Sequence, residues 1–110
     1  MAAAWLRANR CRVLARNFRS QRRGRHTGEV DIVATEDRVL LFVEVKTRQE
    51  DTKVRPLFAV DKAKQKLIER GANDWLRRLG TRAVRWRFDV IEVYVRDGHP
   101  PRVVRVRNAF

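Results

Sequence analysis

Apolar and polar positions follow two different periods along this chain, and the periods separate its helices from its strands. Apolar residues recur at helical spacing over 60–79, whereas 39–46 is an almost unbroken apolar run. Such a run is typical of a central strand that is covered on both faces. The pattern predicts helices at 2–10 and 60–79 and strands at 11–18, 29–34, 39–46, 86–95 and 102–107.

The segments between these elements carry polar and turn-forming residues. We expect loops at 19–28, which is arginine-rich and contains glycine, and at 47–58, which contains Pro56. A tight hairpin with Glu36 and Asp37 as its turn residues would join the strands 29–34 and 39–46. The order α-β-β-β-α-β-β predicts an α/β fold, with a central mixed sheet flanked by helices, in one domain over 1–110.

The balance of charged residues predicts the kind of molecule that the protein binds. Lys and Arg number 26 against 13 Asp and Glu, and the formal net charge is +13. Such an excess predicts a polyanion as partner: nucleic acid, an anionic membrane surface or ribosomal RNA. The alternative is a generally basic protein without a specific partner. Arg22, Arg23 and Arg25 could follow a phosphate backbone, or they could belong to a solvated loop.

Other sequence features bear on the compartment. The longest apolar run, 39–43, is far too short to cross a membrane, and we recognise no signal peptide at the N-terminus. Cys11 stands alone, which fits a reducing cytoplasm, and we expect it to pack in the core. His26 and His99 are isolated in polar segments and are interpreted as surface histidines.

Acidic residues gather on the two strands of the predicted hairpin. Alternation places Glu29 and Asp31 on one face, and likewise Glu44 and Lys46. With the turn at 36–37, Glu29 would oppose Glu44 and Asp31 would lie diagonal to it. Carboxylates so close repel unless a cation lies between them, and Mg²⁺ suits carboxylates together with a substrate phosphate. In the alternative interpretation Glu44 pairs with an arginine and Lys46 simply ends its strand.

The residues Gly28-Glu29-Val30-Asp31 followed by Val43-Glu44-Val45-Lys46 resemble the YraN-like bacterial family. That family is assigned to the PD-(D/E)XK nuclease superfamily, which includes the archaeal Holliday-junction resolvases. The resemblance covers nearly the whole chain. It continues through the segments 14–19, 60–76, 87–90 and 108–110.

The resemblance implies a restriction-endonuclease-like fold and a role for each matching residue. Asp31 and Glu44 would bind Mg²⁺ or Mn²⁺, Lys46 would be the catalytic lysine, and Glu29 would be a further ligand or a neighbour of the ligands. Lys64 and Gln65 would be accessory; otherwise they are solvent-facing helix positions. The family usually carries a Gly-Glu pair in its first helix, and this chain has none there.

These observations leave three functions open. The first is a metal-dependent DNA endonuclease, acting on branched or flapped DNA. The second is a DNA- or RNA-binding module of the same fold without turnover, and the third is a ribosome- or RNA-associated protein whose acidic cluster is structural. Arg48 and Trp86 join the arginines of 19–28 as candidate contacts to nucleic acid, Trp86 by stacking on bases or else by packing at a strand start. A homodimer is compatible with the sequence.

Overall fold

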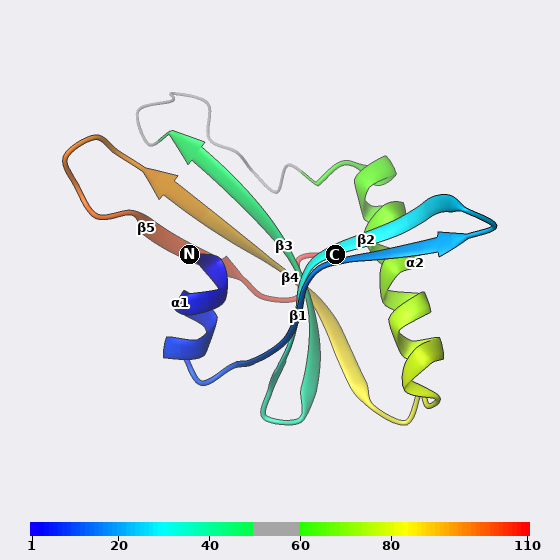
Figure 1. Cartoon of the computed structure of the whole chain (residues 1–110). Helices are drawn as coiled ribbons and strands as arrows, with labels where there is room; N and C mark the ends of the chain where they lie inside the picture. Colours follow the sequence, from blue (N-terminus) through cyan, green and yellow to red (C-terminus); the bar gives the residue numbers. More distant parts are fainter. Residues whose placement is uncertain (50–59) are drawn as a thin grey trace.

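The computed structural model describes residues 1–49 and 60–110, and its elements follow the predicted order (Figure 1). These elements are α1 (Ala2–Ala8), β1 (Arg12–Arg22), β2 (Arg25–Glu36), β3 (Val39–Gln49), α2 (Lys62–Leu79), β4 (Arg85–Val95) and β5 (Arg102–Val106). The strands form one five-stranded sheet in the order β1-β2-β3-β4-β5. Only the pairing of β3 with β4 is parallel among the described strands. The predicted α/β class with a mixed sheet is confirmed.

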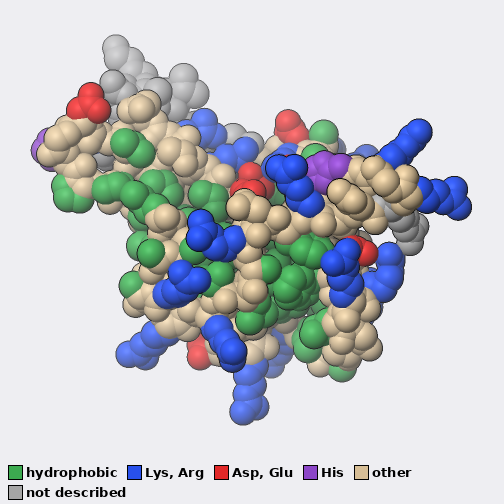
Figure 2. Space-filling model, in the orientation of Figure 1, with side chains coloured by type: hydrophobic (Ala, Val, Ile, Leu, Met, Phe, Trp, Pro, Cys, Tyr) green, Lys and Arg blue, Asp and Glu red, His purple; other side chains and the backbone are tan. Residues whose placement is uncertain are grey.

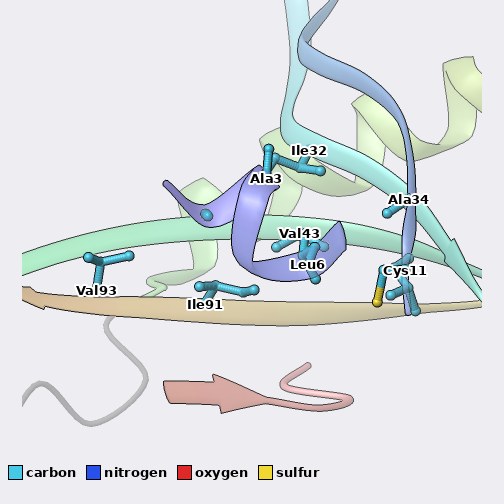
Figure 3. Packing of buried hydrophobic residues seen from close by; sticks show 10 residues of the cluster. Ala3, Leu6, Cys11, Ile32, Ala34, Val43, Ile91 and Val93 are labelled. Atoms are coloured by element: carbon cyan, nitrogen blue, oxygen red, sulfur yellow. The ribbon is translucent and has the colours of Figure 1, made fainter. Parts of the chain in front are cut away.

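The unbroken apolar run of β3 is explained by its position in the middle of the sheet. Leu41 and Val43 pack on the face covered by α1. Leu6 of α1 lies next to Val43 in this cluster (Figure 3). Leu40 and Phe42 pack on the opposite face, under α2. Alternate side chains of one strand therefore enter two separate apolar clusters, and neither face of β3 is left to water.

Helix α2 is held against the sheet at a contact between two glycines. Its first turn is capped by Asp61, whose carboxylate accepts a hydrogen bond from the Lys64 backbone N–H at 2.8 Å, so the helix begins two residues later than predicted. It ends at Gly80 with a φ of 81°, as expected for a C-terminal glycine. A Cβ atom on Gly28 would collide with the Gly71 backbone, so α2 crosses β2 in very close contact.

The predicted loop at 19–28 is wrong. Strands β1 and β2 run through this segment as a long hairpin, with Ser20 opposite Gly28 and the turn at 23–24 (Figure 1). Both turn residues have a positive φ, 52° at Arg23 and 74° at Gly24. The cross-strand pairing and the contact of Gly28 with α2 outweigh the weak strand propensity of these polar residues.

The hairpin between β2 and β3 turns one residue later than predicted. Asp37 and Arg38 are its turn residues, with φ values of 49° and 67°, and Glu36 pairs with Val39. Ile32 consequently lies opposite Val43, where the described pairing ends. The predicted opposition of Glu29 and Glu44 is therefore wrong, and the observed register continues toward Asp31 and Glu44.

The remaining boundaries differ slightly from the prediction. Helix α1 ends at Ala8 instead of residue 10, β1 begins one residue later and ends four residues later than expected, and β4 and β5 each shift by one residue at one end. Residues 47–49 of the second predicted loop continue β3, and the rest of that loop through 58 lies outside the described residues. Among the described helices, none is both long and apolar enough to cross a membrane.

Candidate functional site

Glu44 and Lys46 stand on the face of β3 that α2 partly covers. The alternation of β3 puts Glu44 on the same face as Leu40 and Phe42, and its side chain is only 5% exposed. Lys46 follows on the same face, with its side chain 28% exposed. Strand β3 continues to Gln49, so Lys46 does not end the strand, contrary to the alternative interpretation.

Asp31 lies where the regular alternation of β2 breaks. Val30 and Val33 both pack under α2, although one has an even and the other an odd number, while Ile32 packs on the opposite face. Opposite this point β1 carries Asn17 with a φ of 52°. The predicted sharing of one face by Glu29 and Asp31 through simple alternation therefore does not hold. Instead, the Asp31 carboxylate accepts a hydrogen bond from the Val45 backbone N–H at 2.9 Å. This hydrogen bond holds Asp31 against β3, next to Glu44.

Two lysines bracket the carboxylate of Glu44. The Nζ of Lys46 lies 3.9 Å from Glu44 Oε1, and the Nζ of Lys64 lies 3.9 Å from Glu44 Oε2. Lys64 also forms a close ion pair with Glu29. Lys64, predicted only as accessory, is thus part of the cluster. Gln65 has a structural contact instead, because its Nε2 donates to the Val60 carbonyl at 3.0 Å.

The carboxylate of Glu44 is poorly satisfied by its surroundings. Its Oε2 is buried and has no hydrogen-bond partner among residues 1–49 and 60–110. Burial, followed by the charge of Asp31, raises the pKa of Glu44 from 4.5 to about 7, against the opposing effect of Lys64 and Lys46. Glu29 behaves in the opposite way, because its hydrogen bond from Lys64 lowers its pKa.

The donor set of the cluster fits a hard divalent cation with few protein ligands. In the described part of the chain, no group of three or more His, Cys, Asp or Glu side chains is arranged to hold a metal. Glu29 is bound to Lys64, which leaves Asp31 and Glu44 as the two carboxylates. Mg²⁺ is usually held by one or two carboxylates together with water and substrate phosphate. Glu44 Oε2 is buried and accepts no hydrogen bond from the described residues, and such a cation would bind an atom of this kind.

A small cavity opens next to Asp31. It measures about 200 Å³ and reaches from β2 and β3 to the start of α1. Its lining residues are Met1, Ala2, Ala3, Arg16, Asn17, Asp31, Ile32 and Val45. The first turn of α1 contains no acidic residue, so Asp31 supplies the acidic group among the residues that line this cavity.

The residues predicted to contact nucleic acid are distributed over different parts of the molecule. Lys and Arg side chains are spread over the face shown in Figure 2, including the end where the β1–β2 hairpin projects, and Arg23 and Arg25 are exposed on that hairpin. The side chain of Arg22 lies outside the described part of the structure. Arg48 is half-buried on the same face of β3 as Lys46, opposite Tyr94 in the strand register. Trp86 lies opposite Leu40, four residues before Glu44 along β3. The structure does not bring Trp86 into the cluster.

Two further residues lie next to the site. His26 belongs to β2 rather than to a loop, and its Nε2 lies 3.9 Å from the Glu29 carboxylate. Glu92 is buried and pairs with Lys46 across the parallel strands, and it accepts a hydrogen bond from Tyr94 Oη at 2.8 Å. The strand parity of Glu92 is the same as that of Val90, which pairs with Glu44, so the parallel pairing was the signal that could have placed it.

A second charged cluster lies on the opposite face of the sheet. Arg105 reaches Glu36 at 2.9 Å and Asp89 at 3.0 Å, and Arg87 binds the same two carboxylates at 2.9 Å each. The Asn108 backbone N–H also donates to Asp89 at 3.0 Å. These contacts are consistent with a structural role for Asp89.

Comparison with known proteins agrees with the resemblance noted in the sequence. A family profile described as "Uncharacterised protein family UPF0102" matches residues 1–93. The chain belongs to this family. A UPF0102 protein of Geobacter sulfurreducens is 44% identical over 110 residues, covering all of this chain and 82% of the relative. A UPF0102 protein of Rhodococcus jostii is 39% identical over 110 residues, covering all of this chain and 89% of the relative. The YraN-like assignment is thus confirmed at the level of the UPF0102 family.

Proposed function

We propose that this UPF0102 protein is a metal-dependent endonuclease that hydrolyses phosphodiester bonds in DNA. The proposal includes the restriction-endonuclease-like fold and membership of the PD-(D/E)XK superfamily, with its likeness to the archaeal Holliday-junction resolvases. The mixed sheet with Asp31 on β2 and Glu44 and Lys46 on the next strand is compatible with that fold. Branched or flapped DNA is the proposed substrate, and DNA is favoured over RNA as the partner.

The observation that carries this proposal is the state of Glu44. A carboxylate that is buried, adjacent to Asp31 and without a hydrogen bond to Oε2 destabilises a fold unless something else binds it. Two carboxylates beside two lysines in a protein of net charge +13 suit a cation together with a polyanion. A purely structural role would be better served by the full set of hydrogen bonds that Asp89 receives on the opposite face.

The residues of the cluster would divide the work of hydrolysis. Asp31, Glu44 and the Val45 carbonyl would hold Mg²⁺ or Mn²⁺, which acts as a Lewis acid on a phosphoryl oxygen when bound. Lys46 would bind a non-bridging oxygen of the phosphate and stabilise its charge while water attacks phosphorus. One P–O bond to a sugar oxygen breaks; the attacking water loses a proton to solvent and the leaving oxygen gains one. Glu29 would hold Lys64 against Glu44.

A nucleic-acid-binding module without turnover is the second candidate. It is favoured by the engagement of Glu29 with Lys64 and by the lack of an acidic residue in the first turn of α1. Under this function the basic surface would bind DNA or RNA while the two remaining carboxylates hold no productive metal. The two functions differ in one property, which is cleavage that depends on a divalent cation.

The test is cleavage of flap, junction and single-stranded DNA in Mg²⁺ or Mn²⁺. We expect Asp31→Asn, Glu44→Gln and Lys46→Ala each to lower the cleavage rate at least about a hundredfold, in line with the loss of a group that stabilises transition-state charge. Glu69→Gln is the matched control, because Glu69 is an exposed carboxylate on α2. Lys62→Ala serves the same purpose for the lysines.

The outcomes separate the candidates. Cleavage by the wild type that is lost in the site variants and retained in the controls supports the endonuclease. DNA binding without cleavage under every divalent cation would favour the binding module. If the wild-type protein binds neither DNA nor RNA, both candidates are wrong.

A further inference from the structure

We propose that a groove between the β1–β2 hairpin and α2 binds a phosphodiester group of the DNA backbone, away from the proposed cleavage site. This inference rests on the proposed function and adds to it a second contact with the substrate. The groove has a volume of about 320 Å³. It is lined by Ser20, Gln21 and Thr27 of the hairpin and by Arg70, Asn73, Asp74 and Arg77 of α2.

The groove follows from the way the hairpin meets the helix. Gly28 and Gly71 bring β2 and α2 into close contact, because neither residue has a side chain to separate the backbones. Beyond that contact β1 and β2 continue to their turn, while α2 continues to Leu79 (Figure 1). The space between the hairpin and the helix is where the side chains of the groove meet.

Several hydrogen-bond donors line the groove. Ser20 Oγ and Thr27 Oγ1 lie 3.2 Å apart, and Ser20 is only 2% exposed. When one of these hydroxyls donates to the other, one O–H remains to donate to a ligand. The Asn73 carbonyl oxygen accepts from Arg82 at 3.1 Å, which leaves its amide N–H groups as donors. A phosphate oxygen is an acceptor only, so it matches this set.

The charge of the groove is also suited to an anion. Arg70 is exposed and makes no ion pair or side-chain hydrogen bond within the described part of the chain. Asp74 is the groove's one carboxylate in that part. It forms ion pairs with Arg77 at 3.4 Å and Arg78 at 3.3 Å, and its Oδ2 accepts no hydrogen bond from the described residues. Two guanidinium groups therefore compensate one carboxylate, and Arg70 is left with its full positive charge. This imbalance favours a phosphodiester over a neutral ligand.

The groove lies along the same helix as the proposed cleavage site. Lys64 and Asn73 are nine residues apart on α2, which corresponds to about 14 Å of helix axis. Along one strand of duplex DNA this distance spans roughly four base pairs. The groove would fix the register of the DNA relative to Glu44.

The test measures DNA affinity rather than cleavage, so that it is independent of catalysis. We expect Arg70→Ala to weaken binding of a defined duplex roughly tenfold at about 0.1 M salt and to reduce the slope of log K against log salt by about 1. Adding Arg77→Ala should weaken binding further, and Asp74→Asn should strengthen it. Arg12→Ala is the matched control, because Arg12 is an exposed arginine at the far end of β1.

A second measurement distinguishes DNA from free phosphate. The amide and side-chain signals of Ser20, Thr27 and Asn73 are followed by NMR during titration with the duplex and, separately, with sodium phosphate at matched ionic strength. Shifts on adding the duplex that disappear in Arg70→Ala support the proposal. Shifts that inorganic phosphate causes but the duplex does not would overturn it.

The remaining outcomes are also decisive. If Arg70→Ala loses no more affinity than Arg12→Ala, the groove is not a backbone contact, although the endonuclease proposal stands. If the groove variants lose affinity but no divalent cation supports cleavage, the groove is supported and the catalytic proposal fails. If the wild type binds no DNA at all, both proposals are wrong.

Discussion

The two faces of the sheet carry charged clusters that treat their carboxylates in opposite ways. On the α1 face, Glu36 and Asp89 accept hydrogen bonds from two arginines. The hydrogen bonds from Arg105 are the main cause that lowers the pKa of Glu36 to about 2, although burial acts in the opposite direction. On the α2 face, Glu44 lies beside Asp31, its Oε2 accepts no hydrogen bond from residues 1–49 and 60–110, and burial raises its pKa to about 7. A charge that the protein satisfies by itself supports the fold, whereas a charge left unsatisfied is available to a ligand.

Removing a carboxylate from the satisfied cluster should have the largest effect. We expect Asp89→Ala to lower the free energy of unfolding by about 3–5 kcal/mol, because Arg105, with its side chain 7% exposed, would lose a buried partner. Urea unfolding followed by circular dichroism measures this. Asp74→Ala is the control and should lose less than about 1 kcal/mol, because Asp74 pairs with exposed arginines. Equal losses in the two variants would remove the distinction between a buried and a surface cluster.

The same cluster should give the protein a specific sensitivity to acid. Because the pKa of Glu36 is about 2 in the folded chain and 4.5 ordinarily, its carboxylate stabilises the fold above about pH 4.5. That stabilisation, on the order of 3 kcal/mol, should be lost as the pH falls from 4.5 toward 2. Unfolding free energies of wild type and Glu36→Gln are compared across this range. Their difference should shrink as the pH falls; a difference that stays constant would show that Glu36 is not the group responsible.

The contrast between the faces was only partly predictable from the sequence. Glu44 and Lys46 were placed correctly on one face, because β3 is regular and its alternation holds over its whole length. The arginine partners of Asp89 come from β4 and β5, and spacing along the sequence could not identify them. In a regular strand, alternation along the sequence predicts which face of the sheet a side chain occupies. It does not predict which residues of other strands the side chain contacts.

The errors arose where the backbone departs from regular geometry. Arg38 takes a positive φ in the hairpin turn, which is uncommon for this residue type, so the turn was placed one residue early. Asn17 does the same within β1, and the alternation of β2 breaks opposite it at Asp31. The contact of Lys64 with Glu29 depends on the crossing of α2 over β2 at Gly28 and Gly71, a tertiary contact that no local pattern encodes.

A divalent cation should stabilise the unsatisfied cluster and leave the other one unchanged. At a Mg²⁺ or Mn²⁺ concentration ten times the dissociation constant, the free energy of unfolding should rise by about 1.4 kcal/mol. Thermal unfolding with and without the cation measures this in the wild type. Asp31→Asn should abolish the gain, whereas Glu69→Gln should retain it. A gain of the same size in Asp31→Asn would place the cation elsewhere on the protein.

The smallest expected effect is a gain in stability when the proposed site is partly disabled. In the absence of divalent cations, Glu44→Gln removes a buried negative charge next to Asp31 while keeping the shape of the side chain. We expect the free energy of unfolding to rise by about 1 kcal/mol at pH 8, measured by urea unfolding in the presence of a chelator. Glu36→Gln is the paired variant and should destabilise under the same conditions, because Glu36 accepts hydrogen bonds from Arg87 and Arg105. If Glu44→Gln destabilised the protein as Glu36→Gln does, the two lysines would already satisfy Glu44, and the argument for a ligand at this site would fail. If the two substitutions change the free energy of unfolding in opposite directions, Glu36 stabilises the fold by itself, whereas Glu44 destabilises it in the absence of a ligand.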